Sequence, residues 1–129
     1  MIDVQHYARE SEDMLCVTFQ GKLTQREYLV FRPHLESTIR HYENLRLVFV
    51  MDEDLRWDAR SMWRELKFNS RHRSSIARLA VVAPTAAWRK WLFMACQPLS
   101  VREAAAFTSL EKRLAVAWAA SRVSLRQPW

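Results

Sequence analysis

The apolar stretch that decides the fold is Leu45-Arg46-Leu47-Val48-Phe49-Val50-Met51, which ends at three consecutive acidic residues, Asp52-Glu53-Asp54. A stretch with helical periodicity follows over residues 58–68, and a second apolar run occupies residues 76–83. Two strands joined by a helix usually lie parallel, because a tight turn cannot return the chain in the same direction. Such strands are buried on both faces. This explains why the two segments are almost continuously apolar and do not alternate between apolar and polar residues. The middle of the chain therefore predicts a strand, a helix and a strand in an α/β sheet.

The segments before this unit predict a hairpin and a helix. Residues 3–8 and 14–20 are short apolar segments joined by charged residues, which favours an antiparallel hairpin at one edge of the sheet. Gly21 ends the hairpin, and Thr24 with Glu27 fits a capping box at the start of a helix to about residue 42. Pro33 is expected to bend this helix or to mark a restart. Its core face is expected to carry Tyr28, Phe31, Leu35, Ile39 and Tyr42.

The segments after it continue the alternation. Thr85 is placed to cap a third helix, residues 101–107 predict the last strand, and Ser109 opens a final helix. This final helix carries on one side Leu110, Leu114, Ala117, Trp118 and Ser121. With 129 residues and no linker or repeat, we expect one α/β domain over residues 1–129. It should have a small mixed sheet with an N-terminal antiparallel hairpin, parallel βα units, and helices covering the sheet.

Composition limits the class of partner. A formal net charge of +6 favours an anionic partner, such as an acidic membrane surface, an acidic protein or nucleic acid. Nucleic acid is the least favoured, because the chain has no recognition helix in a known frame, no RNP-like aromatics and no zinc spacing. No apolar run approaches the roughly 20 residues that cross a bilayer, and the first residues lack a secretory pattern, so we expect a cytoplasmic protein. Cys16 and Cys96 are expected to be reduced packing residues.

A series of short motifs runs along almost the whole chain. In order, the motifs are Gly21-Lys22-Leu23-Thr24 with Tyr28, Pro33, Leu47-Val48-Phe49-Val50, Trp57, Met62-Trp63, Lys67-Phe68, His72, Ile76-Ala77-Arg78-Leu79-Ala80-Val81-Val82, Trp88, Phe107 and Ala117-Trp118. This series resembles the SpoIIAA-like family within the wider STAS-domain group. The resemblance implies a small α/β domain that often self-associates, so a homodimer or another protein partner is expected. For many members no enzymatic activity is established.

The phosphorylation switch of some STAS domains is not expected here. STAS domains that antagonise anti-sigma factors are phosphorylated on a serine in an Asp-Ser-Ser-Gly turn at the start of the second helix. The corresponding residues are Asp58-Ala59-Arg60-Ser61, so the modified position holds alanine and the glycine is missing. Ser61 is a nearby hydroxyl, but serine is also a common residue at helix starts.

Catalytic and cofactor sites are not indicated either. His34 and His41 stand two helical turns apart, whereas two imidazoles on one helix share a metal at one-turn spacing. The acidic residues 52–54 suit a solvated turn, although the carboxyl end of a parallel strand is where α/β sheets place ligands. A single glycine leaves no phosphate-binding loop. We therefore expect no enzyme, no metal ion and no cofactor.

Two binding hypotheses remain, and each has a plain structural alternative. Four tryptophans in or beside the predicted helices suggest a site for an apolar or lipid-like ligand: Trp57, Trp63, Trp88 and Trp91. A distant similarity of some SpoIIAA-like sequences to Sec14-type lipid-binding domains points to the same class of ligand. The alternative is ordinary core packing. A basic stripe on the second helix suggests docking on an anionic partner; it comprises Arg60, Arg64, Lys67 and Arg71. The alternative is a solvated helix face.

Overall fold

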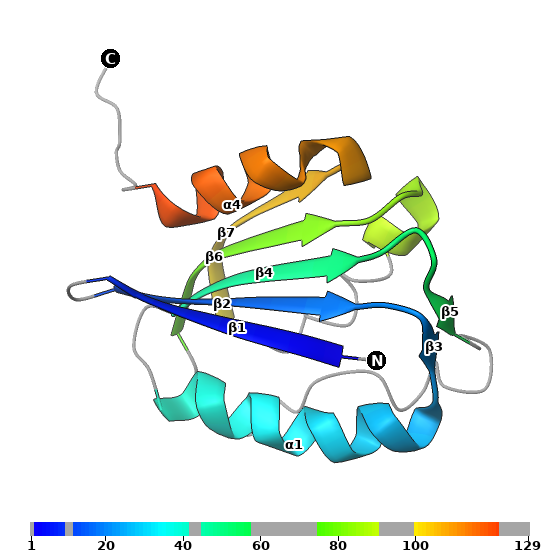
Figure 1. Ribbon diagram of the computed structural model, residues 1–129. Coiled ribbons are helices and arrows are strands. Elements are labelled where there is room, and N and C mark those ends of the chain that lie inside the picture. The colour runs from blue at the N-terminus through cyan, green and yellow to red at the C-terminus, as the bar shows by residue number, and fades with distance from the viewer. Residues whose placement is uncertain (1, 10–11, 42–44, 58–74, 91–99, 122–129) are drawn as a thin grey trace.

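A five-stranded mixed sheet forms the centre of the protein. The structure is a computed structural model that describes residues 2–9, 12–41, 45–57, 75–90 and 100–121. The strands are β1 (Ile2–Arg9), β2 (Glu12–Phe19), β4 (Leu45–Met51), β6 (Ser75–Val82) and β7 (Ser100–Phe107). They lie in the order β1-β2-β4-β6-β7, with β1 antiparallel to β2 and every other neighbouring pair parallel (Figure 1). The predicted mixed sheet with a hairpin at one edge is confirmed.

A small parallel ribbon extends the chain beyond the ends of β2 and β4. It pairs β3 (Lys22–Leu23) with β5 (Arg56–Trp57), two strands too short to leave a periodic signal in the sequence. Gly21 makes the turn into β3 with φ of 64°, a left-handed conformation that favours glycine. Its amide donates to Asp54 Oδ1 at 3.3 Å, and its carbonyl accepts from the amide of Arg56 at 2.8 Å. Asp54 therefore has the structural turn role that the sequence favoured.

The helix α1 (Gln25–His41) covers one face of the sheet (Figure 1). The hydroxyl of Thr24 accepts a hydrogen bond from the amide of Glu27 at 3.1 Å, which supports the predicted cap. Tyr28 and Leu35 are almost fully buried, and Phe31 packs against the same core, as the helical spacing predicts. The helix continues through Pro33 without a restart. The side chains of residues 39 and 42 lie outside what the structure describes.

The opposite face is covered by η2 (Ser109–Glu111) and α4 (Lys112–Ala120) (Figure 1). Ala115 and Ala119 are fully buried against a second core cluster, whereas Leu110 and Leu114 are 96% and 56% exposed. The side of this helix that the sequence pattern singles out therefore faces largely away from the sheet. Alanines allow α4 to lie close to the strands, and a leucine at the same contact would hold it further off.

A third helical segment follows β6. Residues 86–90 are helical, and the amide of Trp88 donates to Thr85 Oγ1 at 3.2 Å, so the predicted cap is confirmed. Cys16 is buried in β2 as expected, whereas Cys96 and the expected second helix over residues 58–68 lie outside the described residues. Within the described ranges, no helix has the length and apolarity needed to cross a membrane.

Candidate functional site

Two buried arginines stand side by side on the face that α4 covers. Arg46 of β4 and Arg78 of β6 are register partners in the parallel ladder, and they are 5% and 7% exposed. A buried guanidinium is stable only where acceptors replace its water, and here the acceptors belong to the end of α4. Arg46 Nη1 donates to the carbonyl oxygens of Ala119, at 2.5 Å, and of Ser121. Arg78 Nη1 donates to Trp118 O and to Ser121 Oγ, both at 2.5 Å.

The position of these arginines follows from helix electrostatics. The last carbonyls of a helix lack partners within the helix and carry the negative end of its dipole. The two guanidinium groups occupy this end, and Arg78 also lies 3.4 Å from a carboxylate oxygen of Glu103 on β7. Its guanidinium carbon is 4.7 Å from the centre of the Trp118 ring, within the range of a cation–π contact. The end of α4 is thus bonded to β4 and β6.

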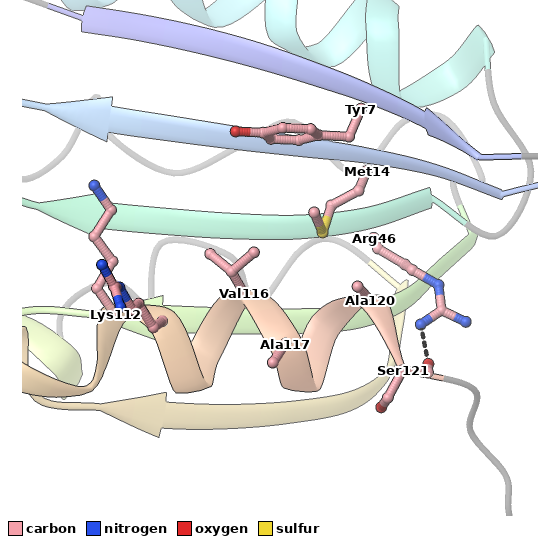
Figure 2. Close-up of a pocket in the computed structure, with 9 residues that line it drawn as sticks. Tyr7, Met14, Arg46, Lys112, Val116, Ala117, Ala120 and Ser121 are labelled. Atoms are coloured by element: carbon pink, nitrogen blue, oxygen red, sulfur yellow. Dashed lines mark hydrogen bonds between the residues drawn. The ribbon is translucent and has the colours of Figure 1, made fainter.

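Beside α4, towards β1 and β2, the surface is hollowed into a groove of about 750 Å³, which we call the α4 groove (Figure 2). Along the described chain α4 contacts mainly β4, β6 and β7, so the groove forms where the hairpin extends past the helix. The groove is lined by Tyr7, Met14, Arg46, Lys112, Arg113, Val116, Ala117, Ala120 and Ser121.

The chemical character of the α4 groove changes along its length. Met14 and Val116 face each other across its middle, while Lys112 and Arg46 stand at opposite ends (Figure 2). The Arg46 end is already engaged with the carbonyls of α4, whereas the Lys112 end is exposed. Tyr7 closes the hairpin side, and its hydroxyl donates to Gln5 Oε1 at 2.5 Å. The groove therefore combines an apolar middle with a cationic, accessible end.

The face of the sheet that α4 covers carries a buried thiol, Cys16. Burial raises the pKa of the Cys16 thiol, although Lys112 acts in the opposite direction, so the thiol is protonated and weakly nucleophilic at neutral pH. Among the residues that the structure places, no three His, Cys, Asp or Glu side chains are grouped as metal ligands. His6 Nε2 lies 3.0 Å from Asp13 Oδ1 on the exposed hairpin, which is a surface pair and not a groove contact.

The tryptophans proposed from the sequence are described only in part. Trp88 is partly buried against the core on the α1 side, so it lies on the face of the sheet opposite the α4 groove. Trp57 belongs to β5, but the structure does not describe its side chain. Trp63 and Trp91 lie outside the described residues. A ligand site among these four residues stays a prediction.

The basic stripe also stays a prediction, because it falls within residues 58–74, outside the described part of the chain; its members are Arg60, Arg64, Lys67 and Arg71. Residues 59–61, where no phosphorylation is expected, fall in the same range.

The α4 groove was missed by reasoning from the sequence, because its walls come from opposite ends of the chain. Met14 precedes the first helix, and Val116 lies in the last one. One local signal was available. A single arginine interrupts each of the two central apolar runs, at Arg46 and at Arg78, and a charge inside a buried strand indicates a specific partner.

Comparison with protein families agrees with this architecture. The SpoIIAA-like family matches residues 14–120, a segment that begins in β2, includes α1 and all the parallel strands, and ends with α4. Comparison with curated proteins gives no match. The family match covers most of the chain and includes every residue that lines the groove except Tyr7 of β1 and Ser121. The chain therefore belongs to the SpoIIAA-like family.

Proposed function

We propose that this protein is a non-enzymatic binding module whose α4 groove accepts an elongated, lipid-like amphiphile with an anionic headgroup. Membership in the SpoIIAA-like family supports a binding or regulatory role in general. The observation that carries the specific proposal is the groove itself, in which an apolar middle leads to a basic, exposed end at Lys112 and Arg113.

The size and lining of the α4 groove support a ligand of this class. Its volume of about 750 Å³ lies within the range of roughly 300–1,000 Å³ that is usual for small-molecule sites. An acyl chain would lie along Met14, Val116 and Ala120, where burial of apolar area favours binding. A carboxylate or phosphate would be held by Lys112 and Arg113, because hydrogen bonds between oppositely charged groups are stronger than those between neutral groups.

A direct test titrates the full chain with a fluorescent C18 fatty acid and, separately, with its neutral methyl ester. We expect saturable binding of the acid and weaker binding of the ester, by about fivefold or more, because the ester cannot pair with Lys112 and Arg113. Replacement of both basic residues by glutamine should remove the difference between the two probes. Equal binding of acid and ester by the unmodified protein would contradict the assignment of the headgroup end.

A filling substitution tests the location of the site. Ala117→Trp places a large ring in the α4 groove from an exposed position, so it should block the probe and leave the fold intact. The matched control is Ala104→Trp on β7, an exposed alanine that pairs with Leu79 of the α1-side core and therefore lies on the other face. If the control weakens binding as much as Ala117→Trp does, the probe does not occupy the groove.

The same titration distinguishes the earlier hypotheses. If Trp88→Ala abolishes binding and Ala117→Trp does not, the ligand occupies the tryptophan site on the α1 side. Binding through the basic stripe should weaken steeply with added salt, because salt screens exposed charges over about 8 Å at physiological ionic strength. A ligand held mainly by its acyl chain should lose much less affinity under the same conditions. Loss of binding in moderate salt and in Arg64→Ala alone would favour the stripe.

A further inference from the structure

The outer side of η2 and α4 exposes two large apolar side chains, Leu110 and Leu114. Leu110 is 96% exposed, which makes it the most exposed large apolar side chain among the described residues, and Leu114 is 56% exposed. Arg113 and Ala117 are exposed as well. Residues separated by three, four and seven positions share one side of a helix, so these four side chains form a single surface, which we call the leucine face. Ala115 and Ala119 point the opposite way, into the core.

The charge beside the leucine face is basic. Arg113 belongs to this face and also lines the α4 groove, together with the preceding Lys112, so the groove opens along one border of the face. The nearest acidic residue, Glu111, accepts a hydrogen bond from the amide of Thr108 at 2.9 Å, and Arg89 lies close enough to contribute to its lowered pKa. The chain as a whole carries +6. The surroundings of the exposed leucines therefore attract anions.

We infer that the leucine face docks the protein on an anionic lipid bilayer. In this arrangement Leu110 and Leu114 enter the boundary between headgroups and acyl chains, and Arg113 contacts lipid phosphates. Interfacial helices bind membranes by this combination of an apolar side and flanking basic residues. A bilayer suits leucines that project from the surface, because lipids accommodate them without a complementary pocket, whereas a protein partner would need one. This docking goes beyond the proposed function, since it does not require an occupied groove.

Flotation of the full chain with vesicles tests the inference. We expect binding to vesicles of 70% phosphatidylcholine and 30% phosphatidylglycerol, and little binding to pure phosphatidylcholine. The double substitution Leu110→Ser with Leu114→Ser should lower the partition coefficient at least tenfold, because both apolar contacts are lost. Arg113→Gln should lower it about fivefold, the usual effect of one basic residue at an anionic surface.

Matched controls come from α1, on the other face of the sheet. Val30→Ser removes a side chain that is 60% exposed, and Arg26→Gln removes an exposed charge, so neither should change the partition coefficient by more than twofold. The urea midpoint of each variant verifies its fold. If the double variant is destabilised, Leu110→Ser alone replaces it, because a side chain that is 96% exposed contributes little to folding.

Three results would overturn the inference. The first is the absence of binding to the anionic vesicles. The second is a double leucine variant that binds as the unmodified protein does, since attraction would then depend on net charge alone. The third is a dimer in size-exclusion chromatography with light scattering that the leucine substitutions dissociate, since the leucine face would then be an interface between two copies of the chain.

Discussion

Replacement of Arg46 by methionine should lower the free energy of unfolding by about 2 kcal/mol and loosen the end of α4. Arg46 is 5% exposed, and its guanidinium joins β4 to the carbonyls of Ala119 and Ser121. Methionine retains most of the unbranched stem and fills the same space without the charge. The substitution therefore isolates the bonds to the helix terminus from the packing of the side chain.

The magnitude follows from opposing effects. A hydrogen bond to a charged group is worth about 1.5–3 kcal/mol, so the loss of two such bonds costs about 3–6 kcal/mol. Two gains offset part of this cost. Methionine does not have to be desolvated as a cation, and Arg78 loses a like charge on the neighbouring strand. Ser121 is exposed, so water can replace the hydrogen bond that its carbonyl loses. Ala119 is buried, so the hydrogen bond that its carbonyl loses is not replaced by water. A net loss of about 2 kcal/mol remains.

Urea titration followed by circular dichroism measures this loss, and hydrogen exchange locates it. The amides of α4 should exchange faster in the variant, while those of α1 should change only by the global loss of stability. Arg26→Met, at an exposed position of α1, is the control and should stay within about 0.5 kcal/mol of the unmodified protein. An Arg46→Met variant within 0.5 kcal/mol of the unmodified protein, or more stable than it, would refute the reasoning, because desolvation would then outweigh the bonds to α4.

Three further predictions follow from the core, a turn and a cap. Leu35→Ala should cost about 2–5 kcal/mol, because Leu35 is 3% exposed in the α1-side core; a loss under 1 kcal/mol in urea would show that this contact is not tightly packed. Gly21→Ala should cost about 1–2 kcal/mol through backbone strain at φ of 64°, since nothing lies within 4 Å of the added methyl group; an unchanged urea midpoint would contradict this. Hydrogen bonds from the backbone and side chain of Thr108 lower the pKa of Glu111 below 4.5, so its stabilising effect is present above that pH and is lost as the pH falls through the lower folded value. NMR titration should find the lowered pKa, and a Glu111 pKa at or above 4.5 would refute these hydrogen bonds, which form a capping box at the start of η2.

The sequence by itself was enough to predict the α/β class, the edge hairpin, the parallel direction of the two central strands and the core face of α1. These features have strong local patterns. The run that includes Leu47 and Phe49 is apolar at nearly every position, and Tyr28 and Leu35 repeat at helical spacing. Capping by Thr24 and Thr85 was also predicted, because a cap requires only a hydroxyl and a helix that starts just after it.

Only the tertiary structure decided which side of α4 is buried, and with it the groove and the leucine face. The sequence of this helix places apolar residues on all its sides, so periodicity selects no unique buried face. The large leucines suggest that their side is buried, whereas it is exposed. Two interactions between distant segments resolve the choice. Ala115 and Ala119 allow close approach to the strands, and Arg46 and Arg78 bond the carbonyls at the helix end. The two arginines inside apolar runs indicate that some partner exists, but no local pattern names that partner, because contacts between segments far apart in the chain form only when the sheet brings them together.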